Sequence, residues 1–257
     1  MNINKNGFQS RPITRYLMLR LIPIDSLLRI IQLLQYFFAR LLFLRDWEFE
    51  VMGRPQFFKH AVDLASWPFE QSRWGFTARG VYARQIMHRG CKVLDICCGD
   101  GFYSSMFFSD VANKVDAVDF DAYAIDYARA YYRRANVEYY QLDITRQLFP
   151  STNYDVVVWN AAICYFSKID IRTIIYKIIN ATTPSGVLIG MCPCANGWVD
   201  HITEFTGAFE LEQFLSQFYD EVLVREIDEG RAISLYFQAS RPLKNLGEEN
   251  ERFFESN

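Results

Sequence analysis

Val93-Leu94-Asp95-Ile96-Cys97-Cys98-Gly99-Asp100-Gly101-Phe102-Tyr103 is the stretch that decides the fold of this 257-residue chain. The short apolar run from Lys92 to Ile96 predicts a buried strand. The run stops at residues with small side chains, and an apolar segment of helical length follows from Phe102. A strand, a tight glycine turn and a helix place backbone N–H groups beside a ligand. The stretch therefore predicts an α/β domain with a ligand-binding turn after a strand.

The spacing of small residues in this turn narrows the choice of ligand. A dinucleotide fingerprint reads G-x-G-x-x-G, with its third glycine inside the helix. Here the spacing is Asp95-x-Cys97-x-Gly99-x-Gly101, and Ser104 stands where that third glycine would fall. The turn resembles the cofactor loop of class I S-adenosylmethionine-dependent methyltransferases, with Cys97 in place of the usual first glycine. A structural turn in another α/β domain is the alternative, so the rest of the chain has to decide.

Strand and helix patterns alternate from residue 91 onward, which is typical of βαβ units and a parallel sheet. Strands are expected near residues 92–96, 115–119, 137–141, 154–159 and 186–191, and helices near 102–110, 122–134, 168–181 and 209–217. Two further strands, Glu221–Ile227 and Ala232–Gln238, predict an antiparallel hairpin. This order resembles the methyltransferase sheet, whereas a dinucleotide domain has six parallel strands. The expected fold is α/β: a seven-stranded, mostly parallel, doubly wound sheet with an antiparallel terminal hairpin and an N-terminal helical extension.

Composition and patterning divide the chain into four parts. Hydrophobic residues make up 51% and charged residues 22% of the sequence, which is typical of globular proteins. We expect an amphipathic helical extension over 1–50, an aromatic lid or cap over 51–90, the methyltransferase domain over 91–240 and a polar tail over 241–257. Within the cap, Trp74, Arg79 and His60 are candidate cofactor contacts.

The N-terminal extension carries an unbalanced charge. The whole chain has net charge −3, which gives no general preference for nucleic acid. Residues 1–45 nevertheless hold seven basic side chains against one acid, and residues 24–44 have the pattern of an amphipathic helix. Its longest uncharged run, Ile30 to Ala39, is too short to span a membrane. Two interpretations stay open: peripheral contact with a membrane surface, or packing on the catalytic domain or on a second copy in a homodimer.

The six cysteines indicate a reducing environment. Most lie in or beside predicted strands, and no secretory signal is visible. A cytoplasmic location is expected, at the inner face of the membrane if the N-terminal helix is interfacial. Cys192-Pro193-Cys194 lacks the second ligand pair of a zinc site, so no metal is predicted.

The strand ends supply the cofactor-binding candidates. Asp119 ends the second strand, where a carboxylate can accept from both ribose hydroxyls, and Phe120 follows it to lie against the adenine. The resemblance implies that Asp143 accepts from the adenine amine while the Ile144 N–H donates to the ring. After the fourth strand, Asn160 and Ala161 are expected to lie beside the sulfonium. The predicted cofactor site is Asp95, Cys97, Gly99, Asp100, Gly101, Asp119, Phe120, Asp143, Ile144, Asn160 and Ala161.

The acceptor side departs from the family pattern. Similar bacterial small-molecule methyltransferases read nearer Trp-Asp-Ala-Ala-Ile-Glu-His-Phe here, whereas this chain has Asn160 for the acid and Cys164-Tyr165 for Glu-His. An oxygen acceptor needs a nearby base, and His201 follows the fifth strand, where Asp200 or Glu204 could orient it. His201 and Tyr165 are the catalytic candidates.

The sequence therefore predicts an S-adenosylmethionine-dependent methyltransferase that acts on a small-molecule, sugar or lipid-linked acceptor. A non-catalytic S-adenosylmethionine-binding partner protein is one alternative, because of the changed residues after the fourth strand. An NAD-dependent oxidoreductase is the other, and Ser104 and the terminal hairpin argue against it.

Overall fold

The computed structural model describes residues 26–27, 29–31, 33–35, 37–38, 73–195, 201–229 and 232–243. The chain divides into two compact units, one of residues 1–54 and 62–68 and the other of residues 55–61 and 69–257. In the first unit the described residues between 26 and 38 are helical, as the amphipathic pattern predicts, and the remainder of the predicted helix lies outside the described residues. No helix in the described ranges combines the length and apolar character needed to cross a bilayer.

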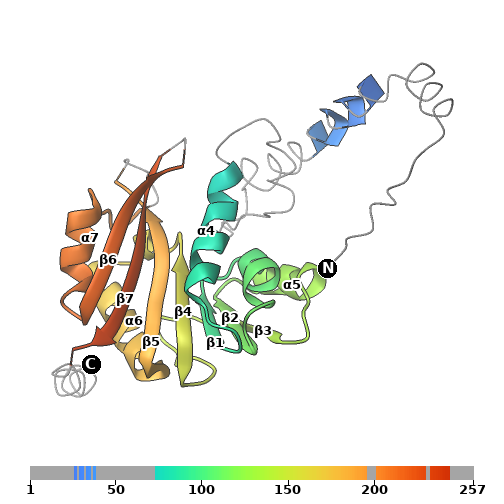
Figure 1. Ribbon diagram of the computed structural model, residues 1–257. Helices are drawn as coiled ribbons and strands as arrows, with labels where there is room; N and C mark the ends of the chain where they lie inside the picture. The colour runs from blue at the N-terminus through green and yellow to red at the C-terminus, as the bar shows by residue number, and fades with distance from the viewer. Residues whose placement is uncertain are drawn as a thin grey trace, which may run out of the picture. The chain divides into compact units, whose positions relative to one another are not determined.

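The second unit alternates strands and helices along the chain (Figure 1). Its elements are α4 (Arg73–Ile86), β1 (Lys92–Ile96), the π-helix η1 (Ser104–Phe108), β2 (Lys114–Asp119), α5 (Ala122–Tyr131), β3 (Val137–Gln141), β4 (Tyr154–Asn160), the 3₁₀ turn η2 (Ile163–Tyr165), α6 (Lys168–Ala181), β5 (Thr182–Pro193), α7 (Ala208–Leu215), β6 (Tyr219–Asp228) and β7 (Ile233–Pro242).

The strands form one seven-stranded sheet in the order β3-β2-β1-β4-β5-β7-β6. Every neighbouring pair from β3 to β5 is parallel, whereas β7 is antiparallel to both β5 and β6. The predicted fold class is therefore confirmed. The order does not match the six parallel strands of a dinucleotide-binding domain, because β7 is inserted between β5 and β6.

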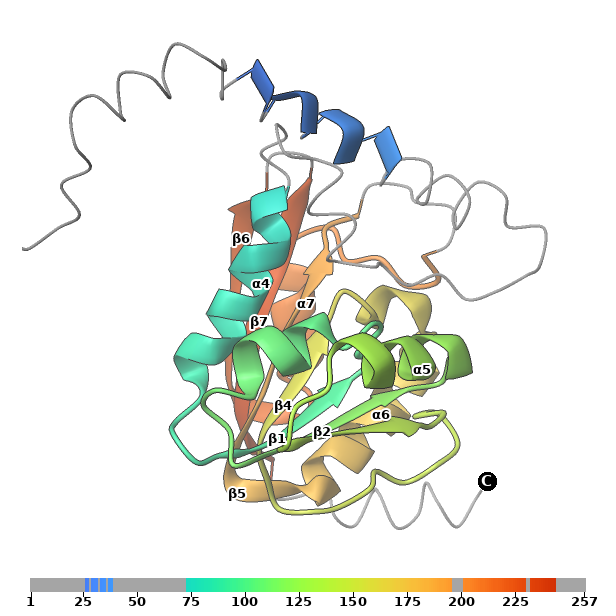
Figure 2. The same ribbon diagram turned by 90° about the vertical axis from the view of Figure 1, so that its right-hand side faces the viewer.

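Helices cover both faces of this sheet (Figure 2). Leu94, Ile96 and Trp159 belong to one buried apolar cluster with residues of α6 and α7. Asp95 points to the opposite face, where Ser104 of η1 donates to it, because side chains alternate along a strand. The sheet is thus doubly wound, and the carboxyl ends of β1, β2, β3, β4 and β5 share one edge.

One predicted helix differs in type and one predicted strand in its start. The segment expected as a helix over residues 102–110 is helical from Phe102 to Phe108, but Ser104–Phe108 is π-helical, and the Ser109 N–H bonds the Ser104 carbonyl. The strand expected near residues 186–191 begins four residues earlier, because β5 starts at Thr182 and includes Pro184-Ser185-Gly186. Thr182 pairs with Tyr154 and Val187 with Val156, so the residues between them bulge out of the ladder. Proline has no N–H to donate, and a residue in a bulge does not need to donate to the neighbouring strand.

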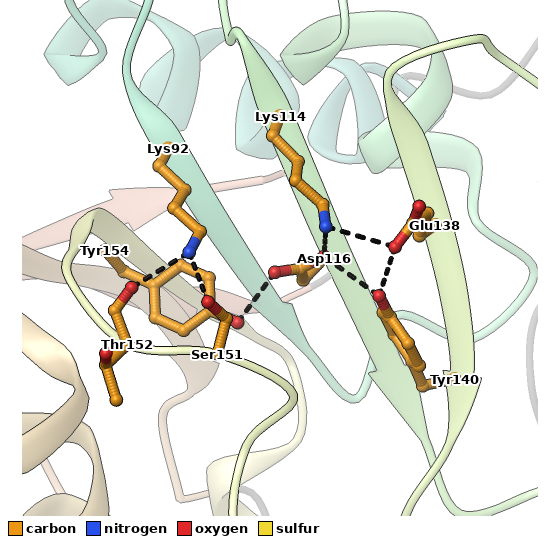
Figure 3. Close-up of polar contacts among 8 residues, drawn as sticks. All are labelled: Lys92, Lys114, Asp116, Glu138, Tyr140, Ser151, Thr152 and Tyr154. Carbon is orange, nitrogen blue, oxygen red and sulfur yellow. Dashed lines mark hydrogen bonds and ion pairs between the residues drawn. The ribbon is translucent and has the colours of Figure 1, made fainter.

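A polar network lies at the amino ends of the strands, away from the predicted cofactor loops (Figure 3). Asp116 has no exposed surface and accepts from the Tyr154 hydroxyl at 2.8 Å and the Tyr140 hydroxyl at 3.3 Å. Lys114 Nζ lies 3.2 Å from Asp116 and 3.1 Å from Glu138. In the same view Lys92 Nζ reaches Ser151 Oγ and, at 2.9 Å, the Thr152 carbonyl.

We expect Asp116→Ala to lower the free energy of unfolding by about 3 kcal/mol. It leaves the buried Tyr154 hydroxyl without its acceptor and removes one of the two acceptors that Tyr140 and Lys114 share with Glu138. Urea denaturation at pH 7 measures the loss. Glu138→Gln is the matched control, since Glu138 sits at the exposed rim of the same network and its side chain is 57% exposed. An equal loss of unfolding free energy in the two variants would contradict the prediction that the buried carboxylate contributes more to stability than the exposed one.

Candidate functional site

The turn after β1 has the backbone that its glycines predict. Cys97, Gly99 and Gly101 all have positive φ, of 57°, 55° and 80°. A Cβ on Gly101 would lie 2.7 Å from a Tyr139 ring carbon and 2.9 Å from the Ala128 Cβ, so glycine is required there for space as well as for conformation. Cys97 takes the left-handed conformation that explains the usual glycine at its position, and a non-glycine residue there is strained. Burial raises the pKa of the Cys97 thiol well above its usual value.

Asp95 and Ser104 connect this turn to η1. The Ser104 hydroxyl donates to Asp95 Oδ2 at 2.5 Å, and the Asp95 side chain is buried. Ser104 therefore uses the position of a dinucleotide fingerprint's third glycine for a polar contact. Burial raises the pKa of Asp95 to about 7, although the Ser104 bond opposes that shift.

This raised pKa predicts a pH dependence of stability. An acid whose folded pKa exceeds its unfolded value keeps its proton longer when folded. Its contribution to stability is therefore full below about pH 4 and is lost as the pH rises through about 7. We expect wild-type protein to lose stability between pH 5 and pH 8, and Asp95→Asn to lose less over that interval. Urea denaturation at both pH values measures the two differences, and equal differences would contradict the assignment to Asp95.

Asp119 ties the end of β2 to the glycine turn. Its Oδ2 accepts from the Gly99 N–H at 2.9 Å and its Oδ1 from the Asp121 N–H at 3.0 Å. Burial raises the pKa of Asp119, while these two backbone donors lower it. Each carboxylate oxygen can accept a further hydrogen bond, so both remain usable by a ligand. The neighbouring Phe120 is 57% exposed, so its ring can contact a bound ligand.

Asp143 and Ile144 begin a tight turn after β3. Asp143 Oδ1 accepts from the Thr145 N–H at 2.9 Å and its hydroxyl at 2.6 Å, and these bonds hold the pKa of Asp143 below its usual value. Asp143 therefore caps the turn, and its Oδ2 lies 3.6 Å from Arg146. Ile144 is buried, yet no described residue accepts from its backbone N–H. The N–H of Ile144 is one of the first in this turn, where backbone donors have no partner within the turn, so it can donate to a ligand.

The end of β4 has two unusual features. Ala161 has a φ of 54°, which is strained for a residue with a Cβ, and its N–H donates to the Met191 carbonyl at 2.8 Å. The buried Asn160 Nδ2 has no hydrogen-bond partner among the described residues. Strained residues thus follow both β1 and β4, which are paired strands, at the edge where the predicted site lies.

The two catalytic candidates lie together beyond this edge. The rings of Tyr165 and His201 meet edge-on with centroids 5.4 Å apart. His201 Nδ1 lies 3.7 Å from Glu204 Oε1, and only 3% of the histidine side chain is exposed. The N–H groups of Ile202 and Thr203 donate to the Cys164 carbonyl at 2.9 and 3.0 Å, which fixes the segment after β5 against η2. Asp200, the other candidate for orienting His201, lies outside the described residues.

Arg79 has a different partner from the one that the cap prediction considers. Its Nε and Nη2 donate to the two Glu229 oxygens at 3.3 and 2.7 Å, and Tyr236 also donates to Glu229. Burial alone would raise the pKa of Glu229, but the bonds and charge of Arg79 hold it below its usual value. The pair joins α4 to the β6–β7 hairpin. The other cap candidates, His60 and the Trp74 side chain, lie outside the described residues.

Sequence reasoning missed Lys177 of α6. Its Nζ donates to the carbonyls of Ile144, Thr145 and Gln147 at 3.0, 2.9 and 3.2 Å. One feature of the sequence could have pointed to it: Lys177 follows Ile174 by three residues, which places a lysine on the apolar face of an isoleucine-rich helix. Its targets are backbone atoms of a distant turn, so no side-chain pattern points to them.

Comparisons with known proteins agree with this arrangement. Residues 93–186 match the family described as "Methyltransferase domain". An uncharacterised methyltransferase of Mycobacterium tuberculosis is 32% identical over 96 residues, which are 37% of this chain and 47% of the relative. A malonyl-[acyl-carrier protein] O-methyltransferase of Acetivibrio thermocellus is 29% identical over 97 residues, or 37% of this chain and 33% of the relative. The matched region thus spans half or less of the length of these curated relatives.

Solved structures extend the likeness of fold over more of the chain. The DhpI–SAH complex has a TM-score of 0.56 at 19% identity and covers 82% of this chain and 96% of that one. The N-methyltransferase NodS of Bradyrhizobium japonicum has a TM-score of 0.54 at 15% identity and covers 68% of this chain and 99% of that one. At these identities the likeness concerns the fold.

Proposed function

We propose that the protein is a class I methyltransferase that transfers a methyl group from S-adenosylmethionine to an acceptor, because its residues 93–186 match the methyltransferase domain family. The observation that carries the proposal is the Ile144 N–H, which donates to no described residue and belongs to the strand end where the adenine is expected. An adenine ring nitrogen is a hydrogen-bond acceptor of the kind that this group lacks. The Asp119 carboxylate and the glycine turn lie at the same sheet edge, in the order that such a cofactor needs.

Each strand end has a separate task in this proposal. The Asp119 oxygens accept from the ribose hydroxyls, and Asp143 Oδ2 accepts from the adenine amine. The exposed Phe120 ring lies against the adenine face. Cys97, Gly99, Asp100 and Gly101 form the turn around the cofactor's amino-acid part, and Asp95 supports that turn through Ser104. Asn160 and Ala161 line the side of the sulfonium. When bound, the cofactor supplies a methyl group activated by a positively charged sulfur.

His201 serves as the base for a hydroxyl acceptor. His201 Nδ1 lies 3.7 Å from Glu204 Oε1, so the carboxylate can orient the imidazole and stabilise the charge that it gains on taking a proton. As the acceptor oxygen bonds the methyl carbon, the carbon–sulfur bond breaks and the hydroxyl proton passes to His201. Tyr165, half-exposed beside this ring, orients the acceptor. Small molecules, sugars and lipid-linked compounds all offer such a hydroxyl.

The N-terminal helix bears on the choice among these acceptors. Its described residues expose large apolar side chains: Leu27, Ile30, Ile31, Leu33, Leu34, Phe37 and Phe38. A face of this kind fits a lipid surface and would bring the enzyme to a lipid-linked acceptor. Packing against a second copy of the chain uses the same face.

Isothermal calorimetry on the full chain tests the proposed cofactor. We expect micromolar binding of S-adenosylhomocysteine and no detectable binding of NADH. Binding of NADH alone would overturn the proposal in favour of an oxidoreductase. Labelled S-adenosylmethionine, incubated with the protein and a fractionated cell extract, then tests transfer. Cofactor binding without labelling of any fraction would favour a non-catalytic binding protein.

A further inference from the structure

Lys177 is a charged residue on the buried side of α6. Only 7% of Lys177 is exposed, and its neighbours in the helix, Ile174, Ile175 and Ile178, are fully buried. Its ammonium donates to three backbone carbonyls, those of Ile144, Thr145 and Gln147, at 2.9 to 3.2 Å. An ammonium has three hydrogen-bond donors, so the carbonyls of the turn after β3 use all the donors of Lys177. Burial lowers the pKa of Lys177, and the nearby Asp143 opposes that shift.

The turn that Lys177 holds is the one assigned above to the adenine. Lys177 bonds the carbonyl of Ile144, the residue whose N–H has no acceptor. It also bonds the carbonyl of Thr145, whose N–H and hydroxyl both donate to Asp143. Lys177 therefore fixes the carbonyl of Ile144 itself, and Asp143 is the residue directly before it. The Leu142 N–H, just before the turn, donates to the Asp119 carbonyl at 2.8 Å, so the turn is also tied to β2.

A second lysine holds the other end of the same connection. Lys92 of β1 reaches Ser151 Oγ and the Thr152 carbonyl, just before β4 begins (Figure 3). The chemistry is the same, an ammonium bonding loop oxygens, but this end lies at the amino edge of the sheet. A lysine that only stabilised the β3–β4 connection could do so from either end. Lys177 differs in acting on the end that carries Asp143 and Ile144.

We propose that Lys177 is a positioning residue for adenine recognition: by fixing the Ile144, Thr145 and Gln147 carbonyls it holds the Ile144 N–H and Asp143 carboxylate in register with the base. The inference rests on the proposed function, because it assumes that the turn binds adenine. It predicts that Lys177 controls the choice of nucleobase without touching the ligand.

The test compares Lys177→Met with Lys92→Met in the full chain. Calorimetry measures the affinity of each for S-adenosylhomocysteine and for S-inosylhomocysteine, in which hypoxanthine replaces adenine. Both variants should melt at lower temperature than wild type. We expect Lys177→Met to bind S-adenosylhomocysteine at least about tenfold more weakly and to lose most of the preference for adenine. Lys92→Met should stay within about twofold of wild type for both ligands.

Each outcome gives a separate answer. Unchanged affinity in Lys177→Met would overturn the proposal, and so would an equal loss for both ligands, because a general loosening of the fold does not distinguish two bases. If Lys177→Met does not fold, Lys177→Gln replaces it, since an amide keeps a donor and loses the charge. Absence of S-adenosylhomocysteine binding by wild-type protein would contradict the proposed function itself, independently of Lys177.

Discussion

His201→Ala is expected to lower kcat for methyl transfer by about 10²- to 10⁴-fold, the range in which general bases contribute. The imidazole is buried, its Nδ1 faces Glu204 at 3.7 Å, and Tyr165 contacts its ring. Glu204 and Tyr165 thus flank the imidazole from two sides beside the expected acceptor position. Label transfer from S-adenosylmethionine to the extract fraction that wild-type protein methylates measures the effect. The affinity for S-adenosylhomocysteine should not change, because His201 is not among the cofactor residues.

Glu204→Gln is the companion variant. An amide can still orient the imidazole but cannot stabilise its charged form, so the loss should be smaller, about tenfold. A His201→Ala variant with unchanged kcat would contradict the assignment. It would also indicate an acceptor, such as an amine, that loses its proton without a protein base.

Asp119→Ala is expected to weaken S-adenosylhomocysteine binding by about 100-fold. The change removes a buried acceptor from the ribose hydroxyls, and it also releases the Gly99 and Asp121 N–H groups that the carboxylate holds. The loss of the ribose acceptor and the loosening of the glycine turn together reduce the affinity more than the loss of one ligand contact would. Calorimetry gives the affinity, and circular dichroism at the same temperature shows whether the variant is folded.

A ligand lacking one ribose hydroxyl separates these two losses. Wild-type protein should bind the 2′-deoxy analogue of S-adenosylhomocysteine more weakly than the parent compound. In Asp119→Ala the two ligands should differ little, because the acceptor for that hydroxyl is gone. If the deoxy analogue is disfavoured equally by both proteins, Asp119 acts only on the turn.

The sequence was sufficient for the order and direction of the strands, because the buried part of each parallel strand is a short apolar run followed by turn residues, although β5, β6 and β7 are longer than those runs. The parallel order follows from the βαβ alternation, and the hairpin follows from two runs close together. It also indicated which residues end each strand, and parallel strands bring those ends to one edge. Cys97 shows the limit of this reasoning: its position was recognisable, but its strained φ of 57° is visible only in the folded chain.

Contacts between distant segments could not be predicted. Asp143 caps its own turn through Thr145, and a capping carboxylate and a ligand-binding carboxylate have the same sequence pattern. The Lys177 ammonium bonds backbone carbonyls, which leave no trace in residue identity. Around the π-helical η1, Ser104 bonds Asp95 and the Phe102 ring packs edge-on against Tyr103 and Phe107. Hydrophobic periodicity does not distinguish this helix from an α-helix.

The bond between Arg79 and Glu229 has a consequence for the order of events during synthesis of the protein. Its two residues are separated by 150 positions, and each is largely withdrawn from water. A guanidinium buried without its carboxylate is costly, so α4 cannot settle in its final place before Glu229 has been made. All five strands of the parallel part of the sheet precede Glu229 in the chain and have been made by then. The nascent chain must therefore wait with β5 unpaired on one side, which favours slow, late completion of the fold.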